Sequence, residues 1–509
     1  MITEALAAWI PTQHFEALPP VARSRAKLAI FDCCGTALAG KHHPASQHLR
    51  QLLIDMGSAP QVRVLGDDMR FSLLDAAWLT GTMTDAYLYS DTHFPSHAHL
   101  TSVLLPVLLA LGEVRDIDGP EAITAYVVGF EVATRLAAAM HPEPDRRGWH
   151  TTAVAGVLGA TATAGRLLGL SPAYLQQAFG IATSEAAGSR CNVGTDALPL
   201  HSGRAARSGL LSALLAAKGL TANPQALEAP MGWLELFGGT ADSRHDVILA
   251  DLGQSFALDG PELHFKFYAN SAATHRFIDA ALELRQQGVT PEQIQRLVCR
   301  GHPTSVQTLR YAQPTTPQQA RVSLPYALAV ALCDGNVGLP QFNLARVQAD
   351  DVQTLMQRIE LAADAALGAS PGSDVTATPA TVMVELTDGR SLTATVAHAH
   401  GSPQRPPRRQ AFEAKFRDCA KTVLSTAQTL LAMRYLYQLD TLPAMHLLLD
   451  GLSLAPGVVQ ATAEDDAGTA PPREATETVR SQETTASQTA EARLAALEAR
   501  LRALENDQP

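Results

Sequence analysis

Residues 194–206 read Gly-Thr-Asp-Ala-Leu-Pro-Leu-His-Ser-Gly-Arg-Ala-Ala, and this stretch is the most informative one for the fold. Glycine, aspartate and proline in its first half are typical of a turn. The small residues that follow His201 favour the start of a helix. Arg204 would then lie near the beginning of that helix, either in a structural ion pair or facing a ligand.

On both sides of this stretch the chain is rich in alanine and leucine, with glycine and proline between the apolar runs. The pattern predicts helices at residues 104–115, 121–140, 152–168 and 205–218. Residues 152–165 are apolar nearly all round, which is typical of a helix buried inside a large bundle. We therefore expect residues 1–262 to form an all-helical domain.

Beyond residue 262 strands and helices mix. Strands are predicted at residues 294–300, 381–386 and 392–397, with a hairpin at Asp388-Gly389, and helices at residues 271–287, 322–334 and 350–366. Helices packed on a small antiparallel sheet would make residues 263–408 an α+β domain. Amphipathic helices at residues 409–450 are expected to return to the first domain. The predicted fold class is mainly α with an α+β second domain.

The last segment, residues 451–509, changes to a composition of Ala, Thr, Glu, Ser and Pro that is typical of a disordered linker. It ends in a short amphipathic helix whose leucines follow a 3-4-3 spacing, at Leu494, Leu497, Leu501 and Leu504. Two heptads are marginally stable alone, so this helix is interpreted either as a solvated helix or as a self-association helix.

Composition excludes several classes of function. The net charge of −11 argues against nucleic-acid binding, which needs clustered Lys and Arg. No apolar run has the length and freedom from charge of a membrane span, and the first residues lack the basic region of a signal peptide, so a cytoplasmic protein is expected. Six scattered cysteines without a CxxC pair argue against an iron–sulfur cluster or a structural zinc. Neither a GxSxG, nor a P-loop, nor a GxGxxG motif occurs.

Five polar segments could carry chemistry. They contain Asp91, Thr92, His97 and His99 in the first, His150 in the second, His201 and Arg204 in the third, Lys266 in the fourth and Tyr326 in the fifth. Free N–H groups at helix starts attract anions, histidine is a general base near neutral pH, and tyrosine can donate a proton. Structural interpretations remain open: His150 could cap its helix, Lys266 could extend to solvent, and Tyr326 could be a core residue. His97 and His99 could be half of a metal site, but no second ligand cluster accompanies them and no metal is expected.

Taken in order, these segments resemble the MmgE/PrpD family of 2-methylcitrate dehydratases and cis-aconitate decarboxylases. The resemblance also includes residues 31–40, 129–133, 165–170, 400–403 and 414–417, and it covers about residues 1–450. It implies a helical domain and an α+β lid domain, usually as a homodimer, with cofactor-free acid–base chemistry on small polycarboxylates in the cleft between them. By this resemblance Thr92, His99, His150, Lys266 and Tyr326 match active-site positions, and His201 and Arg204 match a neighbouring motif.

Two positions depart from the family pattern. The family segment His-Ala-Leu-Asp-Phe-Asp-Asp-Thr corresponds here to residues 85–92, where Leu88 replaces an active-site aspartate. Leu198 replaces the family lysine. Replacing both members of a buried ion pair by apolar residues can leave the stability of a protein unchanged, whereas replacing only one of them lowers the stability. We therefore hypothesise that Leu88 and Leu198 are coupled and make one wall of the substrate pocket apolar.

The resemblance and the residues together predict a lyase, foremost a hydro-lyase of the 2-methylcitrate dehydratase type acting on a small polycarboxylic acid. His150 or His99 would remove a proton beside a carboxylate held by Lys266, and Tyr326 or the other histidine would protonate the leaving group. An isomerase or epimerase, a decarboxylase, and a non-catalytic homologue whose C-terminal helix binds partners remain alternatives.

Overall fold

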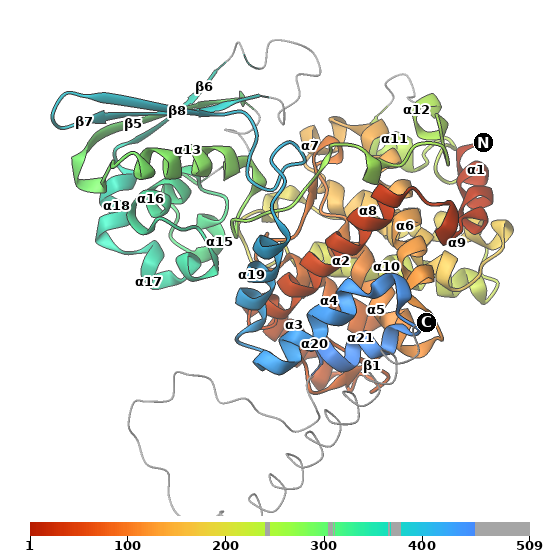
Figure 1. The fold of residues 1–509 in the computed structure, drawn as a ribbon. Helices are drawn as coiled ribbons and strands as arrows, with labels where there is room; N and C mark the ends of the chain where they lie inside the picture. The colour runs from red at the N-terminus through yellow and green to blue at the C-terminus, as the bar shows by residue number, and fades with distance from the viewer. Residues whose placement is uncertain (240–244, 304–308, 310, 365–366, 368–377, 454–509) are drawn as a thin grey trace, which may run out of the picture.

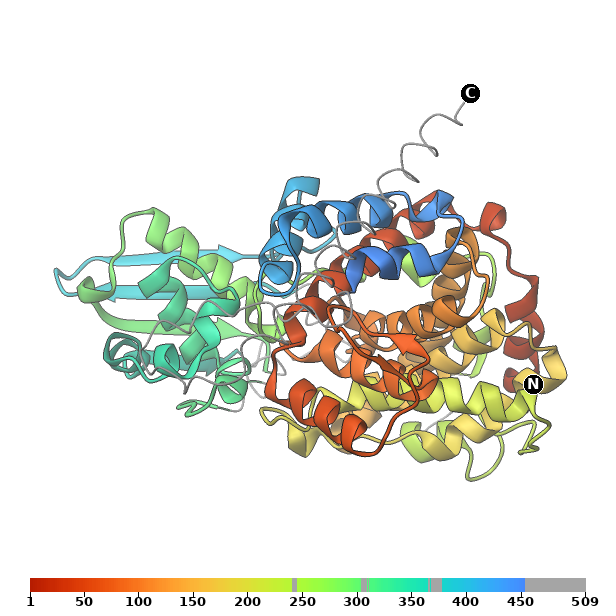
Figure 2. The same ribbon diagram turned by 90° about the horizontal axis from the view of Figure 1, so that it is seen from below.

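The computed structural model describes residues 1–239, 245–303, 309, 311–364, 367 and 378–453. The predicted linker and amphipathic helix lie outside the described residues, apart from residues 451–453. A helical body and a smaller α+β part stand side by side in Figure 1, and Figure 2 shows the same division from below. The predicted fold class is confirmed.

The helical body is built largely from the first half of the chain. Its helices are α1 (Ile2–Trp9), α2 (Pro20–Gly40), α3 (Pro44–Asp55), α4 (Leu73–Asp85), α5 (Thr101–Val114), α6 (Gly119–Met140), α7 (Glu143–Arg146), α8 (Thr151–Leu167), α9 (Pro172–Glu185), α10 (Leu200–Ala217), α11 (Trp233–Gly238) and α12 (His245–Leu249). Short strands also occur in this region: β1 (Val62–Arg63) pairs with β2 (Arg70–Phe71), and β3 (Thr92–His93) pairs with β4 (Leu263–His264).

The stretch at residues 194–206 enters α10, which packs against α4, α8 and α9. Gly203 allows the close approach to α4, because a Cβ atom there would lie 2.2 Å from the carbonyl oxygen of Trp78. Helix α10 begins at Leu200, five residues earlier than predicted. Helix α6 is long and apolar enough to cross a membrane, but 83% of its apolar window is buried inside the protein, as expected for a central core helix.

The α+β part contains a four-stranded sheet with the strand order β6-β5-β7-β8. Its elements are α13 (His275–Gln286), β5 (Ile294–Gly301), α15 (Pro317–Ala320), α16 (Leu324–Asp334), α17 (Leu344–Val347), α18 (Asp350–Met356), β6 (Ile359–Ala363), β7 (Ala380–Leu386) and β8 (Ser391–Val396). Helix α13 packs on β7 and β8, and α16 lies between α13 and α18, so the helices cover one face of the sheet.

The sheet is mixed, which corrects the predicted antiparallel sheet. Helix α18 ends at Met356, and the second half of the helix predicted at residues 350–366 is instead β6, which pairs in parallel with β5. Ile359 and Leu361 alternate with polar or small neighbours over too few residues to outweigh the preceding helical pattern. The ion pair between Arg296 on β5 and Glu360 on β6, at 2.6 Å, joins the two strands.

Three helices follow the sheet: α19 (Arg409–Ala420), α20 (Thr426–Tyr437) and α21 (Met445–Leu452). They lie along the helical body, where α19 packs on α2 and α21 packs on α5 (Figure 2). Lys415 on α19 connects the layers: its ammonium group lies 2.7 Å from a carboxylate oxygen of Asp32 on α2, and it donates to the carbonyl oxygen of Lys266 at 2.7 Å. Through Lys415, helix α19 therefore holds the segment that contains Lys266.

Candidate active site

A pocket of about 140 Å³ lies where the helical body meets the α+β part. Residues from both parts line it: Leu88, Thr92, Phe94, His97, His99, Asp145, His150, Arg190, Val193 and Leu198 from the first, and Lys266, Ser271, Ala272, Ala273 and Val322 from the second. A larger surface hollow beside Met1 and Glu228 has no histidine, lysine or arginine in its lining. The chemistry-bearing side chains therefore identify the smaller pocket as the candidate site.

Local pairing explains why distant residues meet here. The ladder between β3 and β4 sets Thr92 opposite His264, two residues before Lys266. His99 directly precedes the entry to α5, and its backbone N–H donates to Thr152 Oγ1 on α8 at 3.0 Å. His150 is the N-cap residue of α8. The structure thus brings together four of the predicted site residues, Thr92, His99, His150 and Lys266.

His99 lies at the centre of this group. Its Nδ1 atom is 3.0 Å from the carbonyl oxygen of Asp91, 3.1 Å from Thr92 Oγ1 and 3.3 Å from Lys266 Nζ. Burial, reinforced by the charge of Lys266, holds the pKa of His99 well below its usual range. His99 is therefore a neutral imidazole in the free protein at neutral pH.

His150 forms a second pair with His201, whose Nδ1 atom lies 3.1 Å from Nδ1 of His150. Burial, followed by the neighbouring His201 and Arg190, lowers the pKa of His150 to about 3. Because Nδ1 is engaged by His201, Nε2 is the nitrogen left for a ligand. His201 itself does not line the pocket, and its contact with substrate stays a prediction.

Lys266 is the central cation of the site and is almost completely buried. Burial lowers the pKa of Lys266 to about 8, while Asp85 and Asp91 act in the opposite direction. Burial likewise raises the pKa of Asp85 to about 6 and that of Asp91 to about 7. Asp91 does not line the pocket; Thr101 donates to its carboxylate, and its negative charge favours the protonated form of Lys266.

One part of the wall is apolar. Leu88 and Leu198 form a cluster with Val322, and Val193 and Tyr311 pack against it. The side-chain proximity that the coupled-replacement hypothesis requires is therefore present. Leu88 also keeps a left-handed backbone with φ of 51°, a conformation in which aspartate is several-fold enriched over most residues. The backbone thus retains a geometry that suits the aspartate found at this position in the family pattern.

Arg190 contributes a second cation to the pocket. Its guanidinium group lies 2.8 Å from Oδ1 of Asp145, and the other carboxylate oxygen, Oδ2, lies 2.7 Å from Nδ1 of His97. Burial raises the pKa of Asp145, but the hydrogen bond from His97 and the charge of Arg190 outweigh it and hold the pKa below its usual range. The carboxylate thus remains ionised between two partners.

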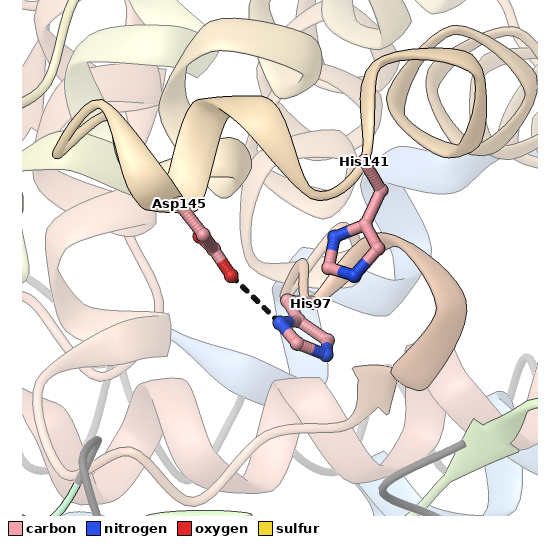
Figure 3. Close-up of side chains that lie close together, drawn as sticks. All are labelled: His97, His141 and Asp145. Carbon is pink, nitrogen blue, oxygen red and sulfur yellow. Dashed lines mark hydrogen bonds and ion pairs between the residues drawn. The ribbon is translucent and has the colours of Figure 1, made fainter. Parts of the chain in front are cut away.

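Among the described residues, His97, His141 and Asp145 form a group that could hold a metal ion, since their ligand atoms all lie within 4.8 Å of one another. Figure 3 shows the three side chains gathered between α7 and the loop that contains His97. Histidine nitrogens and a carboxylate oxygen suit zinc. Both oxygens of Asp145 are already engaged, by His97 and by Arg190, so we interpret the group as a support for Arg190.

Two of the predicted site residues, Tyr326 and Arg204, do not line this pocket. Tyr326 is buried in the core of the α+β part, where its hydroxyl donates to the carbonyl oxygen of Gln341, and it does not line the pocket. Its role as a proton donor stays a prediction. Arg204 is exposed on α10 and does not line the pocket either, so its contact with substrate stays a prediction.

Sequence reasoning missed Arg190, Asp145 and Tyr311. Asp145 lies on the short helix α7 and Arg190 begins a 3₁₀ helix, both without a motif, and their pairing joins segments 45 residues apart. Tyr311 packs beside the apolar cluster and its hydroxyl donates to the carbonyl oxygen of Val193 at 3.0 Å. An available signal was the position of Arg190 just before the 194–206 stretch, in a loop rich in Gly, Ser and Asn.

Comparison with known proteins identifies a family over most of the chain. The model of the MmgE/PrpD N-terminal domain matches residues 4–246, and that of the C-terminal domain matches residues 268–437. Cis-aconitate decarboxylase of Homo sapiens is 29% identical over 473 residues, covering 89% of this chain and 95% of the relative. The enzyme of the same name from Mus musculus is 30% identical over 376 residues, covering 71% and 75%. That of Aspergillus terreus is 27% identical over 460 residues, covering 83% and 90%.

Proposed function

This chain belongs to the MmgE/PrpD family and is a lyase-type enzyme for a small polycarboxylic acid; from that premise we propose that it eliminates water from a hydroxy polycarboxylate without a cofactor. The observation that carries the proposal is the pairing of neutral, buried histidines with one buried lysine. A neutral histidine can accept a proton, and Lys266, with a pKa of about 8, is protonated at neutral pH and can release one.

His150 is the proposed base. Its Nε2 atom takes the proton from the carbon next to a substrate carboxylate, and the electron pair left behind forms the carbon–carbon double bond. A pKa of about 3 makes His150 a weak base in the empty pocket. A bound carboxylate offsets the charge of Arg190 and Lys266, which raises the basicity of His150 when substrate is present.

The pair of Lys266 and His99 is the proposed acid. As the carbon–oxygen bond breaks, the leaving hydroxyl takes a proton from this pair and departs as water. The distance of 3.3 Å between Lys266 Nζ and His99 Nδ1 allows the two groups to share that proton. Thr92, 3.1 Å from the same nitrogen, orients the His99 ring.

Decarboxylation is the second candidate, since the relatives from Homo sapiens, Mus musculus and Aspergillus terreus all carry the name cis-aconitate decarboxylase. It would use the same groups in another order: protonation of a carbon, followed by loss of CO₂. Elimination is favoured because two of the three histidines that line the pocket, His99 and His150, are neutral, which suits proton removal.

Proton NMR in D₂O distinguishes the two reactions. The full chain is incubated separately with citrate, 2-methylcitrate, malate and cis-aconitate, and released CO₂ is measured in parallel. New vinyl signals, or for 2-methylcitrate a methyl signal shifted to that of a methyl group on a double bond, support elimination when no CO₂ is released. Release of CO₂ from cis-aconitate would contradict elimination and indicate a decarboxylase. Loss of a C–H signal without a new product would contradict elimination and indicate an epimerase.

A matched pair of variants tests the base. His150→Ala is expected to lower turnover by roughly 100-fold or more, since general-base help contributes about 10²–10⁴. His48→Ala, an exposed histidine on α3, is expected to leave turnover unchanged. Equal activity of the two variants would remove His150 from the mechanism.

A further inference from the structure

The pocket contains two cations, on different segments, that both act on the proposed base. Arg190 begins a short 3₁₀ helix at residues 190–192, and its backbone N–H donates to the carbonyl oxygen of Gly148 at 2.8 Å. Lys266 follows β4. The positive charges of Arg190 and Lys266 each contribute to lowering the pKa of His150, so His150 lies within the field of both.

Arg190 is held in place yet can still bind a ligand. A guanidinium group has five N–H donors, and the ion pair with Asp145 engages the NH1 nitrogen. Its side chain is 20% exposed and lines the pocket, while Asp145 is fixed from the other side by His97. Such a fixed guanidinium is suited to bidentate recognition of a carboxylate.

The apolar wall has the opposite character. Leu88, Leu198 and Val322 are 9%, 6% and 3% exposed and together present only carbon atoms to the pocket. A carboxylate placed against them would lose its hydration without gaining a partner. An alkyl group placed there gains from leaving water, by about 4-fold in affinity for each methylene buried.

We propose that Arg190 binds one substrate carboxylate, that Lys266 binds the second, and that the Leu88–Leu198–Val322 wall holds an alkyl substituent. The substrate is then a hydroxy dicarboxylate with an apolar branch, rather than a tricarboxylate. This inference rests on the proposed function, because it uses the same pocket and places the proton that His150 removes beside the carboxylate on Arg190.

The test separates binding from turnover. Dissociation constants of the full chain for malate, 3-methylmalate, 3-isopropylmalate and citrate are measured by isothermal titration calorimetry, and turnover is followed by proton NMR in D₂O. Affinity is expected to rise with the size of the alkyl branch, with citrate at least 10-fold weaker than 3-isopropylmalate. Citrate binding as well as the branched acids, or no binding of any acid, would overturn the inference.

Variants of Arg190 test whether its side chain binds a carboxylate of the substrate. Arg190→Gln is expected to weaken binding of every dicarboxylate by about 10–100-fold, as for the loss of a charge-assisted hydrogen bond, and Arg190→Lys is expected to recover part of it. Arg115→Gln, at the exposed arginine at the C-cap of α5, is the matched control and should change nothing. Unchanged affinity in a folded Arg190→Gln variant, verified by its thermal unfolding, would overturn the role of Arg190.

The two hypotheses fail in different ways. If the branched dicarboxylates bind as expected but none yields a vinyl product, the elimination proposed above is wrong while the assignment of substrate class stands. If tricarboxylates bind and react best, elimination stands and the assignment of substrate class is wrong.

Discussion

Lys266 Nζ lies 3.3 Å from His99 Nδ1, so the site holds a buried lysine directly beside a buried neutral histidine. Burial lowers the pKa of Lys266 from 10.5 to about 8. The proposed mechanism needs Lys266 protonated, so kcat/KM is expected to fall as pH rises through about 8. A pH–rate profile of the full chain measures this directly.

Stability is expected to follow the opposite trend over the same range. Between pH 8 and 10.5 the unfolded chain keeps the proton on Lys266 whereas the folded chain has released it, so the folded state gains stability as pH rises. The full shift corresponds to on the order of 3 kcal/mol. Urea unfolding at pH 7.5 and pH 10 measures the gain, and Lys266→Met should remove this part of it.

Lys218→Met, at an exposed lysine at the end of α10, controls for general effects of losing a positive charge. If Lys266→Met and Lys218→Met show the same pH dependence of stability, the pKa of Lys266 is not lowered in the folded protein.

His201 is a positioning residue, because it contacts His150 and does not line the pocket. His201→Ala removes the partner of His150 Nδ1 and is expected to lower kcat by about 10-fold with little change in KM, the size of one hydrogen bond. It should also raise the pKa of His150, since His201 is the second cause of its lowering after burial. Histidine C–H chemical shifts in a pH titration provide that readout. If KM instead rises by about 10-fold while kcat is unchanged, His201 binds the substrate directly.

How far the sequence predicts the site depends on the residue. Thr92, His99, His150 and Lys266 stand at helix starts or beside a strand, in segments whose polar residues interrupt apolar runs, and the structure gathers them. Tyr326 has the same kind of sequence position, yet its hydroxyl donates to the backbone at Gln341. Which side of a helix faces a cleft depends on packing between distant segments. The local sequence does not contain that information.

The fold was predictable to a similar degree. The apolar runs that predicted helices between residues 104 and 218 are long and strongly periodic, and α5, α6, α8 and α10 cover them. Strand β6 was missed because five residues directly after a helix carry too little alternation to be recognised. Arg190 was missed because its role arises from an ion pair with Asp145, a contact that only the folded chain creates.

The apolar wall makes a sharp prediction for a double-mutant cycle. Leu198→Lys alone would place an unpaired ammonium group beside Leu88 and Val322, and is expected to destabilise the protein by about 3–5 kcal/mol. Adding Leu88→Asp supplies the partner and should recover about 1–3 kcal/mol. Urea unfolding of the two single variants and the double variant measures the coupling. Additive effects of the two substitutions would show that the side chains do not interact and that the replacements are independent.

The buried ion pair between Lys415 and Asp32 makes the last prediction. Lys415 also donates to the carbonyl oxygens of Lys266 and Tyr89, at 2.7 and 2.8 Å. Lys415→Met is expected to destabilise the protein by about 3–5 kcal/mol, because it leaves Asp32 buried without its partner. Asp32→Asn breaks the same pair but keeps both bonds to the backbone carbonyls. Only Lys415→Met should therefore release the Lys266 segment and lower kcat as well as stability.

Lys421→Met, at the exposed C-cap of the same helix, is the matched control and should leave both quantities within about 0.5 kcal/mol and 2-fold of the parent protein. Unfolding free energies and kcat of the three variants are measured on the full chain. If Asp32→Asn lowers kcat as much as Lys415→Met does, the ion pair itself maintains the site. If neither changes kcat, the Lys266 segment is held by its own strand pairing between β4 and β3, and the contact from α19 serves stability alone.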